Sequence, residues 1–283
     1  MDYFSGLSGQ SLSFALMMSI CGVAILFMLI GFYCVFKKWS RGSVKYGVEP
    51  EENQSILTFF KVFINQYKSS SVHHGQPLWK TLIFDVLLQR RVYKADKLRW
   101  IMHLMIFYGW MGLFSLSGLM FAFEAVYLTG LVDFNIEEVR GFLQFPNQIL
   151  GYILLIGVLI AIFRRLFIKK VRDSTNSYDS ILLMTLFVVV ATGFIAHAGR
   201  YIDLSLITTQ WENTLLISTN LYKFDVVLWT LGGLDFFKTY VQEFALMHSV
   251  IAIFIGFAYI PFSKYLHAVA TPLSLIVNKG GEN

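Results

Sequence analysis

Five hydrophobic stretches, each about as long as a membrane helix, limit what this chain can fold into. A bilayer core about 30 Å thick is crossed by roughly 20 apolar residues in an α-helix, which bonds its own backbone groups within lipid. The stretches are residues 13–36, 101–123, 146–168, 180–201 and 243–266. Because 56% of residues are hydrophobic and only 14% are charged, no long soluble domain remains. The sequence predicts an all-α integral membrane protein, a single-domain bundle of five transmembrane helices over residues 1–283.

The distribution of Lys and Arg predicts the orientation of this bundle. Residues 37–100 contain twelve of them, and the short turn after the third stretch contains five, Arg164, Arg165, Lys169, Lys170 and Arg172. The loops on the other side contain only Arg140, Arg200, Lys223 and Lys238. By the positive-inside rule, the N-terminus is expected outside and the C-terminus in the cytoplasm of a multi-pass cell-membrane protein. The net charge of +5 therefore indicates topology and attraction to membrane surfaces, not nucleic-acid binding.

Two long loops carry further predictions. In the cytoplasmic loop 37–100, apolar residues recur at helical spacing around Phe59 and again around Leu82, and cations flank both segments. These amphipathic segments are expected either to lie in the membrane interface or to dock a cytoplasmic partner. The external loop 202–242 contains Gly232 and Gly233 as a break and several aromatic residues, as in a lid or re-entrant segment.

The cysteines show which cofactor the chain cannot hold alone. Cys21 and Cys34 both lie in the first stretch, about 20 Å apart along a helix, and no C-x-x-C spacing occurs. The chain therefore contains no Cys-ligated iron–sulfur cluster of its own. If its function requires such a cluster, a partner must supply it.

Four histidines in the predicted spans fall into two pairs when they are ordered by depth. His103 near the start of the second span and His267 at the end of the fifth are both expected near the cytoplasm. His197 at the end of the fourth span and His248 near the start of the fifth are both expected near the outside. Each pair is divided between two helices. One imidazole on each side of a porphyrin is what bis-histidine haem requires.

Other ligand chemistry fits this arrangement less well. Zinc or copper would require more ligands, or sulfur and carboxylate, at one depth. Haem propionates favour cations at the membrane edge, and we expect Arg99 and Lys264 beside the inner haem and Arg200 beside the outer one. The same three cations could also be ordinary snorkelling side chains. The residues thus predict two haem b groups.

The last hydrophobic stretch raises a question of geometry. His248 and His267 are nineteen residues apart, which places them about 100° out of phase on a continuous helix. Pro261 lies between them, and a proline removes one backbone donor and clashes with the preceding turn. We therefore expect Pro261 to kink or rewind the helix.

Several motifs resemble one family of membrane cytochromes. The run from Ile260 to His267, after His248 and before Pro272, resembles the last helix of the respiratory nitrate reductase gamma-subunit superfamily. Further places resemble one branch of it, which comprises the E subunit of heterodisulfide reductase and related membrane subunits of sulfite-reduction-linked complexes. These places are Tyr3 to Leu7, Asp85, Gln89 to Arg91, Arg99 to His103 and Thr192 to Phe194.

The resemblance implies a five-helix dihaem cytochrome b. Such a protein would exchange electrons between a membrane quinone or methanophenazine and a cytoplasmic iron–sulfur subunit, here one that reduces the coenzyme M–coenzyme B disulfide. In the nitrate reductase branch, the second helix supplies one histidine to each haem. Here the position about three turns after His103 holds Gly112 and Leu113, so we take His197 as the substitute ligand.

Two functional hypotheses follow. In the first, a lipid-soluble dihydro-carrier such as dihydromethanophenazine or menaquinol is oxidised near the outer haem, and its electrons pass to a cytoplasmic partner docked on residues 37–100. Glu124, Asp203 and Glu243 are the candidates for the carrier site and for proton release to the outside, although any of them could simply be an interfacial carboxylate. In the second, the chain is a haem-free transporter or scaffold whose histidines carry protons or join helices. The absence of inverted repeats in the sequence disfavours the second hypothesis.

Overall fold

The computed structural model describes residues 10–41, 55–58, 60, 61, 64, 65, 78–204 and 241–277. Within these ranges, the backbone alone is described at residues 10–15, 18, 78, 128, 129, 137, 197–204, 241–245, 276 and 277. The described residues form helices of several kinds, with no β-strand among them. The predicted all-α class is thereby confirmed.

Among the described residues, four helices are long and apolar enough to cross a membrane. They are α1 Gln10–Trp39, α5 Lys97–Thr129, α6 Ile136–Phe167 and α8 Ser177–Leu204. Their candidate spans are Ser19–Trp39, Lys97–Tyr127, Glu138–Phe167 and Ser177–Ala196. These correspond to the first four predicted stretches, so four of the five expected spans are supported by length and composition. The direction in which they cross a membrane stays a prediction.

The fifth predicted span is interrupted. Helix α12, Val241–Ile253, continues as a π-helix, η2, over Phe254–Ala258. Two 3-10 turns follow, η3 at Ile260–Phe262 and η4 at Lys264–Leu266, and helix α13 begins at His267 and ends at Val277.

Proline chemistry explains this interruption. Pro261 has no backbone N–H to donate to the preceding turn, and Ser263, two residues later, is extended with φ −127° and ψ 177°. The prediction that Pro261 disturbs the helix is confirmed. His248 and His267 therefore lie on separate helices, and their phase on a continuous helix does not apply.

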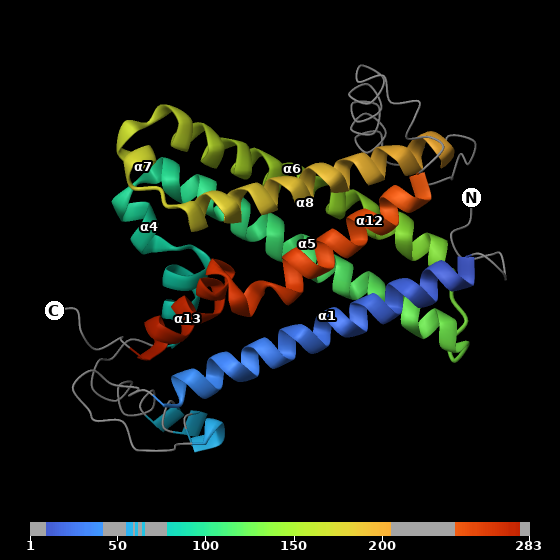
Figure 1. The fold of residues 1–283 in the computed structure, drawn as a ribbon, viewed down its shortest axis with the longest axis horizontal. Helices are drawn as coiled ribbons and strands as arrows, with labels where there is room; N and C mark the ends of the chain where they lie inside the picture. The colour runs from blue at the N-terminus through green and yellow to red at the C-terminus, as the bar shows by residue number, and fades with distance from the viewer. Residues whose placement is uncertain are drawn as a thin grey trace. The chain divides into compact units, whose positions relative to one another are not determined.

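Two compact units contain the described elements. The first comprises Met1–Cys21 and Ile101–Gly256, and the second comprises Gly22–Trp100 and Phe257–Asn283. In the first unit, α8 packs against α6 on one side and against α12 on another (Figure 1). The short basic helix α7, Lys169–Asp173, joins α6 to α8.

Glycines allow α5 and α6 to approach closely. A Cβ atom at Gly109 would lie 2.8 Å from the backbone N of Leu154, and one at Gly157 would lie 3.0 Å from the backbone N of Ile106. Helices in lipid gain stability from such close backbone contact, since apolar burial gives them little advantage over lipid tails. The α5–α6 pair is consequently a closely packed antiparallel hairpin.

The second unit contains most of α1 and the start of α5. Helix α3, Leu78–Lys80, continues into a π-helix, η1, over Thr81–Leu87, and α4 follows at Arg90–Ala95. Gln89 joins η1 to α4 with a positive φ of 49°. The indole N–H of Trp100 donates to the carbonyl of Leu88 at 2.7 Å, which ties this segment to the start of α5. Helix α13 packs against η1.

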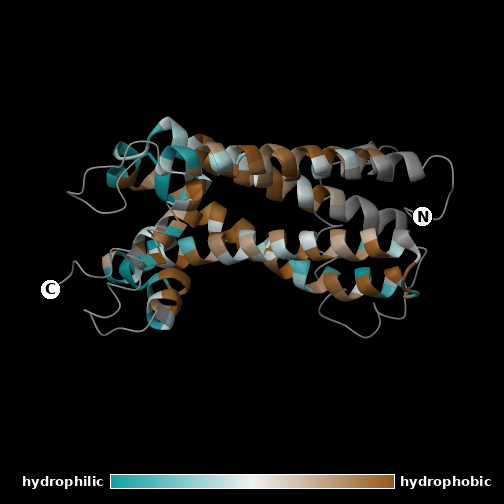
Figure 2. Ribbon diagram, turned by 90° about the horizontal axis from the view of Figure 1, so that it is seen from below, coloured by the Kyte–Doolittle hydropathy of each residue, from teal (hydrophilic) through white to brown (hydrophobic). Residues whose placement is uncertain are grey.

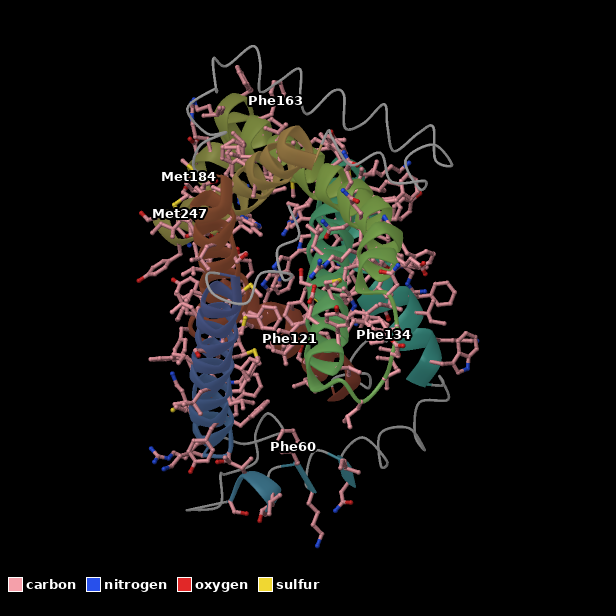
Figure 3. The ribbon with its side chains drawn as sticks, turned by 90° about the vertical axis from the view of Figure 1, so that its right-hand side faces the viewer. Phe60, Phe121, Phe134, Phe163, Met184 and Met247 are labelled. Carbon is pink, nitrogen blue, oxygen red and sulfur yellow. The ribbon has the colours of Figure 1, made fainter. Side chains whose placement is uncertain are left out.

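Apolar side chains cover the outside of the long helices. Figure 2 shows hydrophobic residues along their lengths and hydrophilic residues gathered toward their ends. In the first unit, Phe163, Met184 and Met247 point outward and are well exposed (Figure 3). An apolar surface of this extent is expected of helices that face lipid.

Candidate functional site

His248 is held against helix α8 by a hydrogen bond that defines its tautomer. Its Nδ1 lies 3.0 Å from Oγ1 of Thr192. The single hydroxyl proton of Thr192 is already donated to the carbonyl of Val188, at 2.7 Å. Oγ1 therefore accepts the N–H of Nδ1, and the ring's lone pair resides on Nε2. Nε2 is a nitrogen through which histidine binds haem iron.

The residues on either side of Thr192 complete this contact. A Cβ atom at Gly193 would lie 3.1 Å from Cε1 of His248, so any larger residue would press on the imidazole. The next residue, Phe194, packs on Tyr152 of α6 with ring centroids 4.7 Å apart. The three-residue motif Thr-Gly-Phe thus bonds the histidine, makes room for it and anchors α8 to α6.

His197 lies on the same helix, one turn beyond Gly193. Its backbone is helical, and its side chain lies outside the described side chains, as do those of Arg200, Asp203 and Glu243. The structure brings His248 to α8 within five residues of His197, while the pairing of their two imidazoles stays a prediction. The external loop, from residue 205 to residue 240, also lies outside the described residues.

His267 shows the same tautomer as His248. It begins α13, its side chain is exposed, and its Nδ1 bonds the backbone carbonyl of Lys264. Because a carbonyl can only accept, Nδ1 carries the proton and Nε2 the lone pair. In both histidines of the last hydrophobic stretch, Nε2 is therefore the nitrogen that is able to bind a metal. Histidines that bind metals usually donate their other ring N–H to an oxygen in this way.

His103 belongs to the first unit and His267 to the second. His103 lies six residues after the start of α5, is partly exposed, and has its Nδ1 atom buried. The pairing of His103 with His267 stays a prediction. The proposed propionate partners Arg99 and Lys264 are both exposed in the second unit, where the backbone N–H of Arg99 donates to Asp96 Oδ1 at 3.0 Å.

The structure explains why Gly112 stands where a histidine might be expected on this helix. A Cβ atom at Gly112 would lie 2.7 Å from both methyl groups of Leu150 on α6. This position faces α6, and a side chain here would have to displace the methyl groups of Leu150.

One predicted carrier-site residue, Glu124, forms a buried ion pair. Its Oε1 accepts from Nε of Arg140 at 2.8 Å and from Nη2 at 2.6 Å. Glu124 is on α5 and Arg140 on α6, so the pair joins the ends of the hairpin. The sequence pattern alone assigned Arg140 to an external loop. The sequence signal for this ion pair was that Arg140 follows Glu124 by sixteen residues, across a short turn between two spans.

The predicted docking segment is described in part. Its residues 78–99 expose Trp79, Phe84 and Leu87 together with basic residues of α4. Lys80 lies 5.6 Å from the ring centroid of Trp79. This mixture of exposed aromatic and cationic groups suits either a membrane interface or a protein partner.

Comparisons with known proteins agree on one family. The sequence profile HdrE, described as the E subunit of dihydromethanophenazine:CoB--CoM heterodisulfide reductase, matches residues 79–230. The chain is similar to the protein of that description from Methanosarcina thermophila, 42% identical over 100% of this chain and 98% of the relative. It is also similar to the one from Methanosarcina mazei, 41% identical over the whole of both chains. No solved structure matches the chain.

Proposed function

This chain belongs to the HdrE family, the E subunits of heterodisulfide reductase, and from that premise we propose that it is the dihaem cytochrome b subunit of a membrane reductase complex. Its role is to pass electrons between a lipid-soluble carrier and a cytoplasmic iron–sulfur partner. The subunit itself carries no substrate chemistry beyond electron transfer. The reductase activity belongs to the complex.

One observation supports haem ligation above the others. Both His248 and His267 donate Nδ1–H to an oxygen, one to a threonine hydroxyl and the other to a backbone carbonyl. Such bonds orient a ligand imidazole and increase its basicity. In both histidines this tautomer leaves the lone pair on Nε2, a nitrogen through which histidine binds haem iron. Gly193, which leaves room for the His248 ring, adds to this support.

The four histidines would hold two haem b groups. His103 and His267 are the proposed ligands of the inner haem, and His197 and His248 those of the outer one. Arg99 and Lys264 are the proposed propionate partners inside, and Arg200 outside. When bound, haem supplies reversible one-electron chemistry at iron, and the protein adjusts it through axial ligands, hydrogen bonds and burial.

The carrier is proposed to bind near the outer haem. The names of the relatives specify dihydromethanophenazine, and menaquinol is a carrier of the same reduced, proton-bearing kind. Glu124, Asp203 and Glu243 are the candidate residues for binding it and for releasing its protons outside. Glu124 has the most support, because it is a buried carboxylate near the end of a membrane span, where ionisable residues usually have a function.

The electron acceptor is proposed to be a cytoplasmic iron–sulfur subunit, such as a heterodisulfide reductase catalytic subunit. The exposed aromatic and basic residues of segment 78–99 would form part of its docking surface. This arrangement corresponds to the predicted topology, with the N-terminus outside and the C-terminus in the cytoplasm.

Haem counting tests the proposal. The purified chain should contain two b-type haems by pyridine haemochrome assay and show a reduced-minus-oxidised b-type spectrum. His267→Ala and His248→Ala should each remove one haem, whereas His73→Ala, which alters a histidine outside the four, should remove none. A chain without haem would refute the proposal and favour the transporter or scaffold hypothesis. A chain with one haem would restrict the proposal to a single haem site.

A further inference from the structure

The Glu124–Arg140 pair has an asymmetric geometry. The Nε–H group and one Nη2–H group of Arg140 donate to the same carboxylate oxygen, Oε1. The other oxygen, Oε2, is buried and has no hydrogen-bond partner among the residues that the structure describes. Glu124 as a whole is only 7% exposed. A buried ionised carboxylate thus directs one acceptor oxygen away from its counter-ion.

Such an oxygen is costly to keep. A buried polar atom without a hydrogen bond destabilises the protein, and a carboxylate in a membrane span is more costly still. A purely structural pair would do better with both oxygens bonded, as in the two-pronged arrangement that arginine readily makes with carboxylates. The geometry therefore indicates that Oε2 is reserved for a ligand that donates a hydrogen bond.

The position of the pair limits the nature of this ligand. Glu124 lies three residues before the end of the span Lys97–Tyr127, and Arg140 lies two residues into the span Glu138–Phe167. Tyr127 and Val126 beside it on α5 are each 40% exposed on the apolar surface. Because these neighbours lie on the apolar surface, a molecule dissolved in the lipid phase is better suited to approach the pair than a water-soluble one.

We propose that Oε2 of Glu124 binds the reduced form of the lipid-soluble carrier and that Arg140 is the positioning residue that keeps this oxygen turned toward it. The proposal rests on the proposed function for the class of carrier. A dihydrophenazine has N–H groups and a quinol has O–H groups, while the oxidised forms have only acceptor atoms. An ionised carboxylate can only accept. Glu124 therefore selects the reduced carrier and rejects the oxidised product.

A binding experiment on the full, haem-loaded chain tests this selectivity. Phenazine and dihydrophenazine are the probes, and their dissociation constants are measured anaerobically by equilibrium dialysis in detergent. A hydrogen bond to a charged group corresponds to a preference of roughly tenfold or more, so the wild-type chain should favour dihydrophenazine by at least about that factor.

The substitution Glu124→Gln should remove the preference. Glutamine keeps the shape, still accepts from Arg140, and presents an amide N–H group that bonds oxidised phenazine. Glu138→Gln is the matched control, because this glutamate is exposed on the same hairpin and accepts only from Asn135 among the described residues. Its variant should keep the preference. Equal preference in the wild type and in Glu124→Gln would overturn the proposal.

A second measurement requires no substitution and therefore does not depend on folding of a variant. In the wild-type chain labelled with ¹³C-glutamate, dihydrophenazine should shift a carboxylate stretching band in the infrared difference spectrum, and phenazine should not. An unshifted band would overturn the proposal. Haem content distinguishes the two claims: loss of carrier selectivity with two haems present refutes only the role of Glu124, whereas a chain without haem refutes the proposed function.

Discussion

Replacing Thr192 by valine tests the hydrogen bond that orients His248. Valine has nearly the same shape and remains branched at Cβ, so the helix and its packing should be retained. It cannot accept the Nδ1–H of His248, which Oγ1 of Thr192 now accepts at 3.0 Å. Loss of this bond makes the imidazole less electron-donating. Ferric haem is then stabilised less, and the midpoint potential of the proposed outer haem should rise.

The expected rise in midpoint potential follows from the free energy of the hydrogen bond between Thr192 and His248. A neutral hydrogen bond contributes about 0.5–1.5 kcal/mol, and for a one-electron couple about 1.4 kcal/mol corresponds to 59 mV. If the whole difference falls on one oxidation state, the shift is roughly 20–60 mV. The hydrogen bond between Thr192 and His248 exists in both oxidation states of the haem, so we expect a shift in midpoint potential near the lower end of this range.

The assay is a spectroscopic redox titration of both haems in the wild-type chain, in Thr192→Val and in Thr192→Ser. Serine retains the hydroxyl group and should leave both potentials near their wild-type values. The valine variant should shift one haem and leave the other unchanged. If valine shifts neither potential, or if serine shifts one as far as valine does, the inferred role of the hydroxyl is wrong.

Two further predictions concern the hairpin formed by α5 and α6. Gly109→Val should lower the thermal midpoint in detergent and destabilise the fold by about 1–3 kcal/mol through overpacking, because its side chain would collide with Leu154. Gly118→Val is the control and should have little effect, because a Cβ at this position meets no described atom within 4 Å. Arg140→Met should cost about 3–5 kcal/mol by leaving the carboxylate of Glu124 buried without its counter-ion. Adding Glu124→Gln to that variant should restore most of the loss, and a double variant as unstable as the single one would contradict this explanation.

The sequence was sufficient for the features that depend on local hydrophobicity and on proline chemistry. The four long helices follow from apolar runs of membrane length, and Pro261 identified the place where the last stretch changes its helical form. The extent of the change was not predictable in the same way. The π-helix before the proline and the two 3-10 turns around it lie between a helix that packs on α8 and a helix that packs on η1. Those contacts join segments that are far apart in the sequence, so they could not be read from local patterns.

The sequence predicted the candidate ligands of the site, but it did not predict the side chains that bond to them. Depth ordering selected the histidines, and the motif at Thr192 indicated only a family likeness. Its contribution to the tautomer of His248 required knowledge that α8 and α12 lie side by side. The partner of Glu124 likewise depends on how the turn between α5 and α6 closes. Gly112, at the place of an absent ligand, is a packing position.

Because of the interruption between α12 and α13, the orientations of the two histidines of the last stretch are fixed by different parts of the structure. The orientation of His248 depends on α8, whereas that of His267 depends on the carbonyl of Lys264 one turn earlier in the chain. On an unbroken helix, any rotation at one histidine would turn the other as well. With the break, a change in the orientation of one histidine need not disturb the other, so the midpoint potentials of the two proposed haems could be adjusted one at a time.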